Sequence, residues 1–148
     1  MVGLVVASHG RLADELVATA EQIVGKLSAV ATCNIEPGTS VEDLRVKMRQ
    51  AVDGVDQGDG VIIMADLFGG TPCKESLMMC SERCQSGKFE VLAGVNLPML
   101  LKANSLRAEE MPLADMATQL ASYGQRNITC ASALLREAQQ RQQVAPRT

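Results

Sequence analysis

The 148-residue chain has few aromatic residues and no strong excess of charge. It contains no tryptophan, aromatic residues make up 2% of it, and its formal net charge is −3. Proteins that bind single-stranded nucleic acid stack bases on aromatic side chains inside positively charged grooves. The composition therefore argues against nucleic acid as a partner, and it predicts a core built from Val, Leu, Ile, Met and Ala.

The chain also lacks the ligand spacing of a structural metal site. It has an odd number of cysteines, none in a CxxC pair, and a single histidine. Structural zinc sites use four Cys or His ligands at short, paired spacings. We therefore expect no metal and no cofactor, and we interpret the cysteines as free thiols packed as small hydrophobes in a reducing cytosol. These are Cys33, Cys73, Cys80, Cys84 and Cys130.

No hydrophobic run approaches the ~20 residues that span a bilayer, and the start of the chain does not resemble a signal peptide. We therefore expect a cytoplasmic protein. The length fits one domain with a full core, and the 47% content of hydrophobic residues rules out a mostly disordered chain.

Short apolar runs alternate with amphipathic segments along the chain. Strands are predicted at 2–7, 27–35, 61–65 and 89–93, and continuous apolar runs are typical of parallel strands buried on both faces. Helices are predicted after each strand, and again from Pro112 to Tyr123 with Gly124 just past the end. The pattern predicts an α/β fold: a doubly wound, mostly parallel sheet with helices on both faces, for which we assume the flavodoxin-like strand order 2-1-3-4.

The inward faces of two helices follow from apolar spacing. The helix after the first strand is predicted to use Leu12, Leu16, Ala20, Ile23 and Leu27. The helix after the third strand is predicted to have Thr71 as N-cap and Pro72 as its first residue, to run to about Cys84, and to bury Leu77, Cys80 and Cys84.

Two structures are possible for the tail. Residues 127–135 alternate like a strand, with Ile128, Cys130 and Leu134 on one side, whereas residues 131–143 also fit an amphipathic helix. The residues alone leave both open.

Three strand ends carry loops with chemically useful residues: Ser8-His9-Gly10, residues 66–72 and residues 94–98. If the first and third strands are neighbours, His9 and Asp66 face each other at the switch point where α/β sheets bind ligands. A carboxylate beside an imidazole fixes its tautomer and leaves the other ring nitrogen free to react. Gly69 and Gly70 before a helix could supply backbone N–H groups to a phosphate.

Each of these features also has a purely structural interpretation. A single histidine after a strand is more often structural than catalytic, an aspartate there often caps the next turn, and paired glycines can simply form a loop. A hydrolase using Ser8 is disfavoured, because Ser8 and His9 are sequence neighbours and no GxSxG elbow is present. The three loops together favour a phosphoryl site.

Three segments carry a resemblance to a known family. They are GLVVASHGRLADELVATAEQIVG near the start, GVIIMADLFGGTPCKESL in the middle and VLAGVNLPMLL near residue 95. They resemble the enzyme IIA components of the mannose class of the phosphoenolpyruvate-dependent sugar phosphotransferase system, over residues 2 to about 135.

The resemblance implies a phosphotransferase component with a phosphohistidine intermediate. His9 would accept the phosphoryl group from the carrier HPr and pass it to a IIB component, with Asp66 on the other ring nitrogen and Gly10, Gly69, Gly70 and Thr71 around the phosphate. Contact with a membrane would be only through the IIC and IID permease. The surface that meets these partners would include Arg11, Pro37, Phe68, Lys74, Asn96 and Pro98.

The family fold further implies a homodimer formed by exchange of a C-terminal antiparallel strand, here Asn127–Leu134. The IIA domain would then occupy 1–135, and 136–148 would be a helical or frayed tail.

The chain departs from the family pattern in two respects. Cys73 and Lys74 stand where family members usually carry Phe-Asn, and no Ala/Pro linker to a IIB domain follows. We therefore expect a free-standing IIA. Two alternatives stay open: a regulatory module without a transport role, and the related phosphocarrier of a dihydroxyacetone kinase.

Overall fold

The computed structural model, described here for residues 1–83 and 88–144, has a central sheet of four parallel strands. The strands are β1 (Gly3–His9), β2 (Val30–Ile35), β3 (Val61–Ala65) and β4 (Phe89–Ala93), in the order β2-β1-β3-β4. This confirms the predicted strand order. All four carboxyl ends therefore lie at one edge of the sheet, and β1 and β3 are direct neighbours there.

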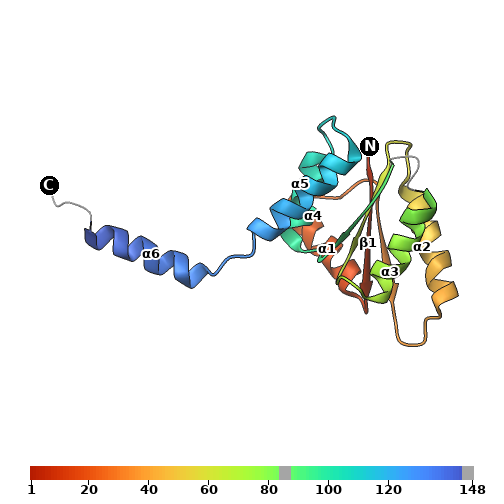
Figure 1. Cartoon of the computed structure of the whole chain (residues 1–148), viewed down its shortest axis with the longest axis horizontal. Helices are drawn as coiled ribbons and strands as arrows, with labels where there is room; N and C mark the ends of the chain where they lie inside the picture. Colours follow the sequence, from red (N-terminus) through yellow and green to blue (C-terminus); the bar gives the residue numbers. More distant parts are fainter. Residues whose placement is uncertain (84–87, 145–148) are drawn as a thin grey trace.

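The helices form two layers around this sheet (Figure 1). One layer holds α1 (Leu12–Val24), α4 (Leu97–Leu106) and α5 (Leu113–Arg126), and the other holds α2 (Val41–Val55) and α3 (Thr71–Arg83). A sixth helix, α6 (Ala131–Val144), lies apart from these layers at the end of a short connection (Figure 1). The body is thus a doubly wound α/β sandwich, as predicted.

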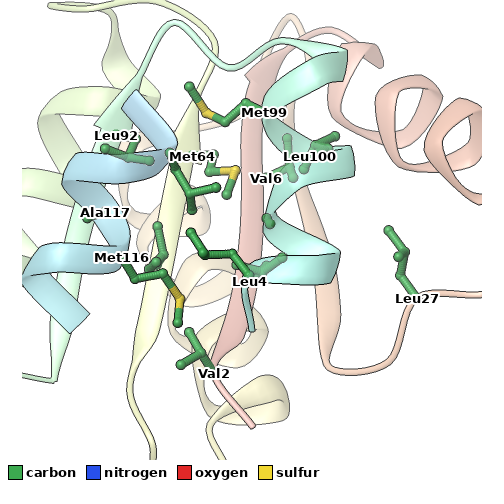
Figure 2. Packing of buried hydrophobic residues seen from close by; sticks show 14 of the residues in the cluster. Val2, Leu4, Val6, Leu27, Met64, Leu92, Met99, Leu100, Met116 and Ala117 are labelled. Carbon is green, nitrogen blue, oxygen red and sulfur yellow. The ribbon is translucent and has the colours of Figure 1, made fainter. Parts of the chain in front are cut away.

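Two apolar clusters hold the layers to the sheet because successive strand residues face opposite sides. Val2, Leu4 and Val6 point toward the layer of α1, α4 and α5, where Figure 2 shows them beside Met64, Met99, Leu100 and Met116. Val5, Ala7 and Ile63 face α2 and α3. With few aromatic residues available, methionine fills much of this core, as its flexible side chain allows.

A buried arginine that the sequence analysis did not single out ties three segments together. Arg107 follows α4, and its Nη1 donates to the carbonyl oxygens of Val2 (3.0 Å), Ser28 (2.8 Å) and Ala29 (3.4 Å). Burial lowers the pKa of this guanidinium. Ala29 has a left-handed φ of 51°, so the arginine secures a tight turn just before β2.

The single tyrosine lies where α5 approaches α4. Lys102 Nζ and Arg126 Cζ are 5.4 Å and 6.0 Å from the centroid of the Tyr123 ring. Both distances are within the range of a cation–π contact.

The predicted inward face of α1 was partly wrong. Leu12 and Ile23 are exposed, and the fully buried residues of the helix are Ala13 and Ala20. Because small residues face the sheet, α1 can approach it closely, and the larger side chains lie at the flanks of the helix. Apolar spacing alone does not distinguish this arrangement from a leucine-lined face.

The face predicted for α3 was also wrong. Leu77 is exposed and Cys80 is half-buried, whereas Cys73, Ser76 and Met79 are buried. Ser76 can be buried because its hydroxyl donates to the carbonyl of Pro72 (2.6 Å), and buried Glu75 accepts from Arg45 Nε (2.7 Å). The helix buries satisfied polar groups that hydrophobic periodicity cannot recognise. Cys84 lies outside the described residues.

The C-terminal region differs from the predicted strand. Helix α5 continues to Arg126, so Gly124 does not end it as predicted. A Cβ on Gly124 would lie 2.9 Å from Met99 Cε, so the glycine lets α5 approach α4 closely. No strand is present in residues 127–134 of the described chain, and Ala131–Val144 form α6 instead. The helical alternative is the correct one here, because its sequence is rich in Ala, Leu, Arg, Glu and Gln, all strong helix formers.

The thiols are not uniformly buried. Cys33 and Cys73 are buried, and burial raises the pKa of the Cys33 thiol. Cys130 is exposed, which contradicts the expectation of a packed thiol. The pKa of its thiol is lowered, mainly by a hydrogen bond with Ser132. Cys84 again lies outside the described residues. None of the described helices is both long and apolar enough to cross a membrane.

Candidate functional site

The histidine at the end of β1 and the aspartate after β3 meet at the carboxyl edge of the sheet. Asp66 Oδ2 accepts hydrogen bonds from His9 Nδ1 (2.9 Å) and from the backbone N–H of His9 (3.0 Å). The His9 side chain is 48% exposed, whereas the Asp66 side chain is 10% exposed. The predicted pair therefore forms, with a largely covered carboxylate behind a ring that reaches solvent.

The surroundings of Asp66 favour its ionised form. Burial acts to raise the pKa of this carboxyl, but the hydrogen bonds and charge of His9 and the backbone N–H of Leu67 outweigh it and lower the pKa. The residue is held in register because its own N–H donates to the carbonyl of Ala7 (3.1 Å). With Nδ1–H donated to the carboxylate, the free nitrogen of a neutral ring is Nε2.

The start of α3 lies against the imidazole ring. The helix begins at Thr71, and the N–H of Lys74 donates to the carbonyl of Gly70 (2.9 Å), so Gly70 occupies the cap position that the sequence analysis gave to Thr71. A Cβ on Gly70 would lie 2.9 Å from His9 Cε1. Gly69, with φ of 83°, makes the left-handed turn before it. The positive end of the helix dipole is thus close to the ring, where it favours an anion.

Two neighbours of His9 fix the loop that follows it. Ser8 is fully buried and its Oγ accepts from the N–H of Ala13 (2.7 Å), which anchors the first turn of α1 to β1. Gly10, with φ of 57°, donates its N–H to the carbonyl of Ile35 (2.7 Å). Ser8 is therefore a structural anchor. Ser8 lies near the end of β1, and its burial excludes it as a nucleophile.

The other predicted surface residues near the ring are exposed. Phe68 is 79% exposed in the loop between β3 and α3, beside Leu67, an exposed leucine that the sequence analysis missed. Arg11 precedes α1, and Lys74 and Thr71 lie in the first turn of α3, all exposed. These side chains surround the carboxyl edge of the sheet, although none of them is in hydrogen-bond contact with His9 among the interactions described.

Residues of the β2–α2 and β4–α4 loops lie at the same edge but differ in exposure. Pro37 is exposed in the β2–α2 loop. Asn96 caps α4 through an Oδ1 that accepts from Met99 N–H (3.0 Å), and its Nδ2 donates to the carbonyl of Gly124 (3.3 Å). Both polar ends of Asn96 are therefore used within the chain, and Pro98 is partly buried in the first turn of α4.

The arrangement suits covalent chemistry on nitrogen. Among residues 1–83 and 88–144, no cluster of His, Cys, Asp and Glu could hold a metal ion. A half-exposed imidazole with a largely covered carboxylate on Nδ1 presents Nε2 as a nucleophile, and the carboxylate stabilises the positive ring formed when Nε2 is substituted.

A family model, curated relatives and solved structures all point to the same protein family. The PTS system fructose IIA component family (EIIA-man) matches residues 3–132. The chain is 27% identical over 132 residues to the PTS system fructose-specific EIIA component of Bacillus subtilis (strain 168), which covers 89% of this chain and 88% of that protein. The crystal structure of phosphotransferase system component EIIA from Streptococcus agalactiae has a TM-score of 0.82 and 27% identity, over 90% of this chain and 99% of that one.

A further relative is longer. The chain is 26% identical over 127 residues to the PTS system mannose-specific EIIAB component of Escherichia coli (strain K12), which covers 86% of this chain but 38% of that protein. The matched region of the family, residues 3–132, contains His9, Asp66 and the start of α3. The chain belongs to the mannose-type enzyme IIA family of the phosphotransferase system.

Proposed function

We propose that this protein is a phosphoryl carrier that accepts the group from phospho-HPr on Nε2 of His9 and passes it to a IIB component. The observation that carries the proposal is the 2.9 Å contact between His9 Nδ1 and the largely covered Asp66, which leaves Nε2 as the reacting nitrogen. Family membership supports a carrier role in sugar phosphotransfer. Such a carrier works in the cytoplasm and meets the membrane through its permease.

The transfer step uses groups already in place. The Nε2 lone pair forms a bond to phosphorus, the bond between phosphorus and the donor atom breaks, and its electron pair returns to the donor. The ring becomes positive, and Asp66 stabilises it through Nδ1–H. The N-terminus of α3, which begins at exposed Thr71 and follows Gly70 beside the ring, would favour the negative phosphoryl oxygens. Transfer to IIB reverses these steps.

The test uses labelled phosphoenolpyruvate with enzyme I and HPr. We expect one acid-labile phosphate per chain in the unaltered protein and none in His9→Ala, because the chain has no second histidine. Arg136→Ala, on distant α6, is the matched control and should be labelled normally. Full labelling of His9→Ala would refute the proposal.

Transfer of the phosphoryl group from this protein to a IIB protein distinguishes a carrier from a regulatory module. Adding a mannose-class IIB protein to the labelled chain should move the phosphate to IIB. A protein that is labelled but donates to no IIB would favour a regulatory module or a carrier for dihydroxyacetone kinase, since both would use the same site.

We also propose that the working unit is a homodimer in which a second copy covers α6. A lone 14-residue helix is marginal in water. Its Leu134 and Leu135 are 53% and 59% exposed, and Ile128 before it is exposed as well. Covering these side chains would stabilise the helix, which takes the place of the strand expected in this region.

A further inference from the structure

Gly70, in the loop before α3, lies beside the reactive ring. A Cβ built on Gly70 would lie 2.9 Å from Cε1 of His9, closer than side-chain carbons normally come to a neighbour. Asp66 holds the adjacent ring atom, Nδ1, at 2.9 Å. Asp66 therefore holds the ring at Nδ1, and the absence of a side chain on Gly70 leaves the space that Cε1 occupies.

The backbone itself does not require a glycine at this position. The φ angle of Gly70 is not positive, whereas its neighbour Gly69 has a φ of 83°. A Cβ on Gly69 would meet nothing within 4 Å. Gly69 thus serves the turn, and Gly70 serves the space that the ring occupies.

The amide of Gly70 is also already directed elsewhere. Its N–H points at the carbonyl of Leu67 (3.4 Å), and its own carbonyl accepts from the N–H of Lys74 (2.9 Å). These two hydrogen bonds belong to the loop before α3 and to the first turn of α3. What Gly70 contributes to the site is therefore its lack of a side chain.

We propose that Gly70 is a positioning residue that keeps the His9 imidazole on Asp66 and so keeps Nε2 aligned for phosphoryl transfer. Any side chain here would push the ring toward solvent, where it is already 48% exposed. Such a shift costs little stability, because the ring is the free end of a side chain, but it breaks the contact with Asp66. The role rests on the proposed phosphoryl transfer, although the ring position itself can be measured without transfer.

The first experiment follows the ring directly by nitrogen and proton NMR. Because His9 is the only histidine, its ring signals need no assignment. In the unaltered protein we expect the Nδ1–H form with a proton protected by Asp66. In Gly70→Ala we expect loss of that protected proton and a mixture of tautomers, with circular dichroism unchanged. A retained Nδ1–H signal, or failure of Gly70→Ala to fold, would overturn the proposal.

The second experiment compares transfer rates. Gly70→Ala should slow transfer from phospho-HPr by roughly 10- to 100-fold, since misplacing a reacting atom by 1 Å can have that effect. In an Asp66→Asn background the same change should have almost no further effect, because the contact is already altered. Fully multiplicative losses would show that Gly70 acts on the phosphate and not through the ring, and would overturn the proposal.

Two glycines provide matched controls. Gly54→Ala places the same methyl in α2, where no atom lies within 4 Å and φ is not positive, and should leave the ring signals and transfer unchanged. Gly69→Ala strains the loop without touching the ring, so it should keep the Nδ1–H signal. If the unaltered protein shows the protected Nδ1–H but takes up no phosphate, the proposed function fails while the placement of the ring stands.

Discussion

His9 and Asp66 act as one unit, so a change at the carboxylate is expected to affect chemistry at Nε2. We predict that Asp66→Asn slows phosphoryl transfer by about 10²-fold, similar to the loss of a general acid–base group. The fold should be kept, because an amide fits the same space. The rate of label transfer from phospho-HPr measures the effect. A folded variant with nearly normal transfer would remove Asp66 from the site.

The same residue predicts a pH dependence of stability. The folded-state pKa of Asp66 is lowered, so its carboxylate stabilises the fold above the unfolded-state pKa of about 3.9. This contribution is lost as the pH falls through the lower folded-state pKa. The difference in unfolding free energy between the unaltered protein and Asp66→Asn should therefore be largest near neutral pH and shrink below about pH 4. Denaturant titrations at several pH values test this.

At the scale of elements, Arg107 joins the end of α4 to the start of β1 and to the turn before β2. Its guanidinium is buried and bonded to three carbonyls, so we predict that Arg107→Ala lowers the free energy of unfolding by about 2–4 kcal/mol. Arg107→Lys should recover only part of this, because the lysine chain is one atom shorter than the path to Arg107 Nη1 and an ammonium is more strongly hydrated than a guanidinium. Denaturant unfolding measures both.

The comparison variant for Arg107 is Arg136→Ala, which removes an exposed arginine from α6. It should change the unfolding free energy by about 0.5 kcal/mol or less. If Arg107→Ala changed the unfolding free energy as little as Arg136→Ala, the three carbonyls would have to bond water or other donors without cost. The proposal that Arg107 stabilises the fold by joining these segments would then be wrong.

The elements also show how far sequence reasoning reaches. The alternation of strands and helices could be predicted from the apolar runs. With the flavodoxin-like order assumed, the meeting of His9 with Asp66 followed, because parallel strands place their carboxyl ends at one edge. The buried face of α3 could not be predicted, because Glu75 and Ser76 are buried only with their hydrogen-bond partners. These partners are Arg45, on α2, and the carbonyl of Pro72, one turn earlier in α3. The contact of Gly70 with the ring depends on tertiary placement that no local pattern encodes.

At the scale of the whole molecule, α6 is an exposed extension from a complete α/β body (Figure 1). We predict that removing residues 128–148 leaves the melting temperature of the body nearly unchanged but converts a dimer to a monomer. Light scattering and thermal unfolding measure the two effects. In the full chain, Leu134→Gln with Leu135→Gln should also give a monomer, because glutamine keeps helix propensity and removes the apolar side chains.

Two outcomes would contradict this prediction. A truncated chain that is still dimeric would place the interface on the body, and a full chain that is monomeric at all concentrations would remove the dimer. Gln139→Ala, an exposed change on the same helix, should leave the association state as it is.

The position of Tyr123 makes the protein its own optical probe. The chain has no tryptophan and one tyrosine, so near-ultraviolet emission comes almost entirely from a ring placed between Lys102 and Arg126, at the base of the tail. Charged groups over the ring and its degree of hydration both change its fluorescence. A second molecule that covers the tail, or a change in how α5 meets α4, would therefore alter the emission intensity and could be titrated without any attached dye.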